Sequence, residues 1–144
     1  MVSAEDRTTL ERVLADWARH WSSHDLDHLL ALFTDDLVFE DVAQGVVHRG
    51  KDSVRAFAER VFPGFPDMTL ELTSRFVTGS QGGGEWMMRG TNRGDSPGMP
   101  ATGKQVELRG ASIFEFAADG KIRRYADYWD MATFLKQLGL MPSG

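Results

Sequence analysis

The sequence predicts an α+β fold: a strongly curved antiparallel sheet forms a cone-shaped barrel that is wrapped by three N-terminal helices and followed by a short C-terminal helix. Two observations favour this fold. Apart from one short hairpin, apolar residues up to position 62 recur at intervals of three and four, as in helices that pack on a core. Between positions 68 and 130 apolar and polar residues alternate, as in strands with one buried face. A bent sheet with helices on one face would enclose a cavity.

Four helices are expected, and local signals mark where they begin or end. Asp25 is placed to cap the second helix and Asp130 the last, because an aspartate side chain accepts hydrogen bonds from the free N–H groups of the first turn. Pro63 and the glycine after it are expected to end the third helix. The predicted helical segments are 3–21, 26–33, 51–62 and 131–138.

Six strands are expected, two in an early hairpin and four in a later meander. The segments Gly79–Gly84 and Ala117–Gly120 are interpreted as turns of the meander. The longer Gly94–Lys104 connection is rich in glycine and proline and is expected to form the lip of the pocket. The predicted strands are 37–41, 45–49, 68–78, 85–93, 106–116 and 121–130.

Length and composition restrict the class of protein. The 144 residues suit a single domain spanning 1–144, and 42% hydrophobic residues are enough for a packed core. A net charge of -5 disfavours nucleic acid or an anionic membrane as a partner. Cysteine is absent, which excludes disulfides and a thiolate nucleophile. With no signal-peptide pattern and no long apolar stretch, we expect a soluble, cytoplasmic protein.

Two aspartates are the main catalytic candidates. Asp41 shares one face of its strand with Phe39, and Asp127 shares a face with Tyr125 and Trp129. If both faces turn inward, two carboxylates enter an aromatic pocket, where burial raises their pKa values and makes them usable as proton carriers near neutral pH. The alternative is that each aspartate ends its strand at the surface or pairs with an arginine.

Several other residues are candidate substrate contacts. Indole and phenol groups such as those of Trp17, Tyr125 and Trp129 can form pocket walls or steady an oxyanion, although core packing is the ordinary role of an aromatic. Arg89 could hold a carboxylate or lie at the surface. His48 follows the short returning strand and could relay protons at the pocket mouth, although a surface position is the alternative.

Sequence patterns typical of metal and cofactor sites are interrupted or absent. His20, His24 and His28 have the four-residue spacing of metal ligands on a helix, but the sequence Ser-Ser-His-Asp interrupts their common face. No dinucleotide fingerprint, phosphate-binding loop or serine-nucleophile elbow is present in the sequence. We therefore expect neither a metal nor a cofactor.

Three segments of the chain resemble the nuclear transport factor 2-like superfamily, and within it the SnoaL-like polyketide cyclases. They are WARHWSSHDLDHLLALFTDDLVFED from residue 17, HRGKDSVRAF from residue 48, and GKIRRYADYWD from residue 120 with FLKQLGL shortly after it. The resemblance covers nearly the whole chain. It implies that Asp127 is the acid/base of an intramolecular aldol closure and that no cofactor is needed. The histidine that supports this residue in the cyclases has no counterpart around Ser112.

Other members of the same superfamily have different activities, and the resemblance to them implies alternatives to a cyclase. The position of the general base in ketosteroid isomerase matches Asp41 of this chain. The positions of the isomerase's two oxyanion donors match Trp17 and Ser112. In limonene epoxide hydrolase an acid and an arginine match Asp127 and Arg89, but Thr91 replaces a second aspartate. A non-catalytic module that binds a hydrophobic ligand is a further alternative.

The sequence therefore predicts an enzyme, a cyclase or isomerase, that acts on a small hydrophobic, enolisable carbonyl compound bound in the cone. Asp127 would transfer the proton and Asp41 would assist it or act as the alternative base. We expect a homodimer through the open face of the sheet, on which alternation is taken to place Trp86 and Met88. The predicted substrate-binding residues are Trp17, His48, Arg89, Ser112, Tyr125 and Trp129.

Overall fold

The structure is a computed structural model that describes residues 4–94 and 100–141 of the chain. The predicted α+β class is confirmed, with helices and strands close to the expected segments. The elements are α1 (Ala4–Ser23), α2 (Leu26–Ala31), β1 (Phe33–Asp41), β2 (Val46–Arg49), α3 (Lys51–Gly64), β3 (Thr69–Thr78), β4 (Gln81–Thr91), β5 (Gln105–Phe116), β6 (Ile122–Trp129) and α4 (Met131–Gln137).

The strands form one curved sheet in the order β2-β1-β6-β5-β4-β3. The sheet is not closed, because β2 and β3 form its two edges. All neighbouring strands are antiparallel except β1 and β6, which run parallel. This one parallel pair is possible because the long connection between β1 and β6, unlike a hairpin turn, does not force them to run in opposite directions.

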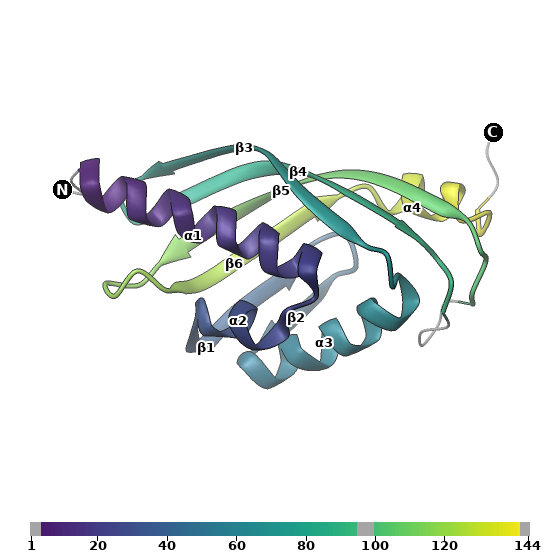
Figure 1. The fold of residues 1–144 in the computed structure, drawn as a ribbon, viewed down its shortest axis with the longest axis horizontal. Helices are drawn as coiled ribbons and strands as arrows, with labels where there is room; N and C mark the ends of the chain where they lie inside the picture. The colour runs from purple at the N-terminus through teal and green to yellow at the C-terminus, as the bar shows by residue number, and fades with distance from the viewer. Residues whose placement is uncertain (1–3, 95–99, 142–144) are drawn as a thin grey trace.

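Helices cover one face of the sheet and bury the core against it. In Figure 1, α1 crosses in front of the sheet, with α2 and α3 beside it. The face of α1 that the periodicity predicts to be apolar is buried, with Leu14 and Trp17 almost fully inaccessible. Both predicted aspartate caps are present: Asp25 accepts a hydrogen bond from the backbone N–H of His28, and Asp130 from that of Thr133.

Three boundaries differ clearly from the prediction. Strand β1 begins at Phe33, four residues before the predicted start and inside the segment predicted as the second helix. The segment Gly82–Gly84 belongs to β4 and is not part of the turn, which is therefore tighter than expected. A side chain on Gly84 would collide with the backbone carbonyl of Ser74 on β3, so glycine is required here by close strand approach and not by turn geometry. Helix α3 also continues through Pro63 and ends one residue later.

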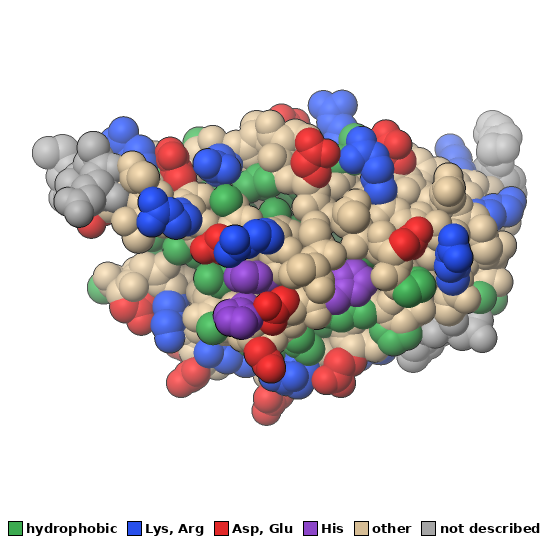
Figure 2. Space-filling model, viewed as in Figure 1, with side chains coloured by type: hydrophobic (Ala, Val, Ile, Leu, Met, Phe, Trp, Pro, Cys, Tyr) green, Lys and Arg blue, Asp and Glu red, His purple; other side chains and the backbone are tan. Residues whose placement is uncertain are grey.

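The visible surface carries no dominant charge. In Figure 2, acidic and basic side chains are interspersed over the helical face. Within the described residues, no helix is both long enough and apolar enough to cross a bilayer.

Candidate active site

The helices and the sheet enclose a cavity of about 230 Å³. Its walls are mainly aromatic and aliphatic, and all four tryptophans of the chain contribute to them. Two carboxylates, those of Asp41 and Asp127, also line it. An apolar cavity that contains a few converging polar groups is the usual form of a small-molecule site.

The two aspartates are brought together by the parallel pairing of β1 and β6. Asp41 and Asp127 are direct partners in the register of these strands. Adjacent strands lie about 4.8 Å apart, so the two carboxylates project side by side from the same face of the sheet. The sequence places these residues far apart, but the inward direction that alternation suggested for each is the one observed.

Asp127 takes part in a chain of three hydrogen-bonded side chains. The indole N–H of Trp86 donates to the Ser112 hydroxyl at 2.9 Å, and this hydroxyl donates to Asp127 at 2.5 Å. Burial raises the pKa of Asp127 to about 7; the Ser112 hydrogen bond opposes this rise, and the nearby Asp41 carboxylate adds to it. Asp127 therefore exists in both protonation states near neutral pH, as a group that accepts and returns protons must.

Asp41 is held more firmly and is only 2% exposed. Its Oδ1 accepts a hydrogen bond from the indole N–H of Trp129 at 2.9 Å and another from the backbone N–H of Gln44 at 3.3 Å. Burial raises its pKa, although these two hydrogen bonds and His48 act in the opposite direction. Asp41 is thus a fixed acidic neighbour of the more accessible Asp127.

Two hydrogen-bond donors near the carboxylates have no partner. The indole N–H of Trp17 and the hydroxyl of Tyr125 are buried and find no hydrogen-bond partner among the described residues. The two rings pack edge to face, 5.7 Å apart. Trp17 lines the cavity as predicted, whereas Tyr125 is fully buried and does not line it. Burial raises the pKa of Tyr125 well above its ordinary value, and Asp127 adds to this effect, so the phenol remains a donor at neutral pH.

His48 is buried beside the cavity and does not line it. Its Nδ1 lies 3.2 Å from the Ser53 hydroxyl, and its ring stacks on Phe39. Burial lowers the pKa of His48, and the positive charge of Arg60 lowers it further. The ring is therefore a neutral packing group behind Asp41, and the position at the pocket mouth expected from the sequence is wrong.

Arg89 lies on the opposite face of the sheet from the two aspartates. Its guanidinium forms ion pairs with Glu71 and Glu107, at 3.4 and 3.5 Å, next to a separate polar depression. Its expected role as a substrate contact in the cone is wrong. The epoxide hydrolase alternative required Arg89 beside Asp127, so this geometry removes it.

Trp86 and Met88 were expected on the open face, and this is also wrong. Both line the cavity, and Trp86 is only 5% exposed. The Trp86 indole lies directly over Gly110 of β5, where a methyl side chain would collide with the ring. Alternation shows which residues share a face, but it does not show which face is covered by helices.

Besides several apolar wall residues, the sequence analysis missed two polar residues of the cavity. Arg60 on α3 and Gln44, between β1 and β2, line the cavity. Arg60 follows the cavity residue Phe57 by one helical turn, and this spacing is the signal that could have identified it.

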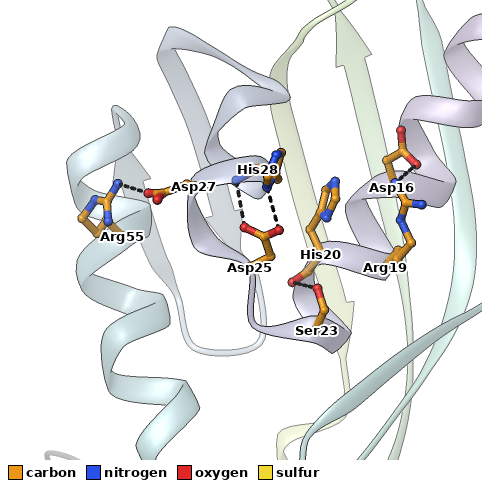
Figure 3. A network of polar contacts seen from close by, with 8 residues as sticks. All are labelled: Asp16, Arg19, His20, Ser23, Asp25, Asp27, His28 and Arg55. Atoms are coloured by element: carbon orange, nitrogen blue, oxygen red, sulfur yellow. Dashed lines mark hydrogen bonds and ion pairs between the residues drawn. The ribbon is translucent and has the colours of Figure 1, made fainter.

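The histidines of the N-terminal region do not converge on one point. The rings of His20 and His28 stack, and His28 binds the cap residue Asp25 at 2.6 Å (Figure 3). His24 instead stacks on Phe62 and its Nε2 contacts the Met68 carbonyl. Within the described residues, no group of three potential ligands could hold a metal ion.

The expected lip of the pocket is only partly described. Residues 95–99 of the Gly94–Lys104 connection lie outside the described residues. None of its described residues lines the cavity.

The fold and the cavity define a class of proteins. A curved, unclosed sheet with helices on one face is a ketosteroid isomerase-like fold, and a protein of Catenulispora acidiphila solved with that fold is similar to this chain with a TM-score of 0.78 at 19% identity, over 90% of this chain and 93% of that one. The family model of the SnoaL-like domain matches residues 14–125, and the chain belongs to this family.

Other solved structures share the fold. TsrD from Streptomyces laurentii is 24% identical, with a TM-score of 0.83 over 94% of this chain and 98% of that one. IdmH from Streptomyces antibioticus, named as a proposed polyketide cyclase, is 25% identical, with a TM-score of 0.78 over 90% of this chain and 98% of that one. No curated protein sequence matches the chain significantly.

The raised pKa of Asp127 predicts a pH-dependent effect of the Asp127→Asn substitution on stability. Between the unfolded pKa of about 4 and the folded pKa of about 7, the folded state binds more protons, so the wild type loses stability as pH rises through this window. Asparagine does not titrate. We expect the variant to melt about 3–8 °C above wild type at pH 8 and to lose that advantage near pH 4.5, measured by calorimetry.

Asp36→Asn is the matched control, because Asp36 is exposed on the same strand as Asp41. Its effect should not change with pH in this way. An Asp127→Asn effect that is equal at both pH values would contradict the raised pKa.

Proposed function

We propose that this protein is a cofactor-independent acid/base enzyme that acts on a hydrophobic, enolisable carbonyl compound of the polyketide type, as a cyclase or an isomerase. The observation that carries the proposal is Asp127: a carboxylate with a pKa of about 7 that faces an apolar cavity beside a second carboxylate. Membership of the SnoaL-like family supports this class of reaction.

The reaction would begin with proton removal. The ionised Asp127 carboxylate takes a proton from the carbon next to a substrate carbonyl, and the C–H electron pair forms an enolate. In a cyclase this carbon attacks a second carbonyl of the same molecule, and the resulting alkoxide is protonated by Asp127. In an isomerase Asp127 returns the proton to a different carbon. Both routes need one group that works in both directions near pH 7.

The enolate oxygen requires donors. Ser112 was one candidate, but its hydroxyl already donates to Asp127. The N–H of Trp17, which lines the cavity, has no hydrogen-bond partner among the described residues, and neither has the O–H of Tyr125, which is buried next to Trp17 and does not itself line the cavity. In such a water-poor site a hydrogen bond to a developing charge is most effective. We assign the oxyanion contact to these two groups and a supporting role to Ser112 and Trp129, which orient the carboxylates.

The cavity also restricts the substrate. At about 230 Å³ it is smaller than the roughly 300–1,000 Å³ of typical ligand pockets. One or two rings can be enclosed, and a larger polyketide-type molecule must extend through the opening.

A non-catalytic binding module is the competing function. A cavity without inward carboxylates would favour it, whereas this cavity holds two. A protein that only binds a ligand does not need a carboxylate that is half ionised at neutral pH. We therefore favour an enzyme over a binding module.

Proton transfer to a simple probe tests the proposed role of Asp127. With 2-tetralone, a two-ring ketone, the wild type should accelerate exchange of the α-protons in deuterated water, measured by NMR. The rate should rise with pH to a plateau above about 7, because only ionised Asp127 accepts a proton. Asp127→Asn should abolish the acceleration, while Asp36→Asn should retain it.

Asp41→Asn extends this test. Removing the neighbouring negative charge should lower the pKa of Asp127 and move the rise to lower pH. Full exchange activity in folded Asp127→Asn would refute the assignment of the base.

Substitution of the proposed oxyanion donors should slow proton exchange. Tyr125→Phe removes only the hydroxyl and should slow exchange of 2-tetralone protons by about 10²-fold, mainly in kcat. Trp17→Phe should have an effect in the same direction. Tyr128→Phe is the control, since Tyr128 is 47% exposed on the other face of the sheet. Equal rates for the Tyr125 and Tyr128 variants would exclude Tyr125 as a donor.

The oligomeric state of the protein can also be predicted. We propose a homodimer through the outer face of the sheet, where Phe76 and Ile113 lie together over Gly83 and remain 51% and 40% exposed. Light scattering at micromolar concentration should give the dimer mass for the wild type and the monomer mass for Ile113→Lys. A monomeric wild type would overturn this proposal.

A further inference from the structure

The opening of the cavity is marked by two residues. Among the described residues that line the cavity, only Arg60 and Gln44 are exposed, whereas the others are buried or partly buried. These two side chains therefore lie where the cavity meets solvent. Asp41 and Asp127, by contrast, project from the sheet that forms the inner wall.

Arg60 is the only positively charged residue among those described that line the cavity. It makes no ion pair or hydrogen bond with the rest of the described chain, whereas Arg55 on the same helix pairs with Asp27. Arg60 is also not among the groups that shift the pKa of Asp127, so it does not neutralise the catalytic carboxylate. Its positive charge is thus available to a molecule that enters the cavity.

We propose that Arg60 selects substrates that carry a carboxylate at the end that remains at the cavity opening. This deepens the proposed function and rests on it, because it names the class of substrate for the same site. The inner carboxylates repel an anion, and a protein with a net charge of -5 repels it in general. An anionic group can therefore bind only at the rim, where guanidinium binds carboxylate oxygens through two parallel N–H groups.

The geometry then fixes the orientation of the substrate. With its carboxylate at Arg60, the apolar part of the molecule enters the aromatic cavity and its carbonyl is directed towards Asp127. A molecule too large for about 230 Å³ must protrude, and the protruding end meets Arg60 and the Gln44 amide.

Calorimetric titration with a matched pair of probes tests the proposal. 2-Naphthylacetate and 2-naphthylacetamide share one apolar skeleton and differ in charge. The wild type should bind the acid at least about threefold more tightly than the amide, and this preference should weaken with added salt. Arg60→Gln should abolish the preference by weakening binding of the acid to the level of the amide, and Arg60→Lys should retain part of it.

Arg55→Gln is the control for loss of one positive charge from α3, and it should behave like the wild type. The proposal is overturned if the wild type shows no preference for the acid, or if the preference survives in Arg60→Gln. Because the experiment measures binding and not turnover, its result is separate from the proton-exchange test of Asp127.

Discussion

The parallel pairing of β1 with β6 is the constraint on which the site depends. It places Asp41 and Asp127 in direct register on the inner face of the sheet, where neither can move away from the other. Burial raises the pKa values of both carboxylates, and the negative charge of Asp41 adds to the rise at Asp127. Strand order thus places a carboxylate with a pKa of about 7 beside a second buried acid and against the cavity.

The neighbouring polar groups distinguish the two carboxylates. Asp41 accepts an indole N–H and a backbone N–H, which hold it in place, while Asp127 accepts one hydroxyl and stays partly accessible from the cavity. Identical side chains thereby acquire different roles through their surroundings. The Trp86 indole completes this arrangement by fixing the Ser112 hydroxyl, so that its proton points towards Asp127.

Alternation along single strands predicted part of this site. It correctly grouped Asp127 with Tyr125 and Trp129, because residues two apart share a face in any strand. It failed for Arg89 and Trp86, since β4 carries large side chains on both faces and only the helical layer decides which face is inside. The link from Ser112 to Asp127 depends on the β5–β6 register, which no local pattern specifies.

Two buried hydrogen-bond donors lie near Asp41 and Asp127. The Trp17 N–H and the Tyr125 O–H are buried without a hydrogen-bond partner among the described residues, and a buried donor in that state costs about 1–3 kcal/mol. Helix α1 supplies one donor, and the facing sheet supplies the other together with Asp127. A carbonyl oxygen placed against these donors relieves that cost, and it does so most when it becomes negative. In the proposed function, the same groups would favour the enolate over the ketone.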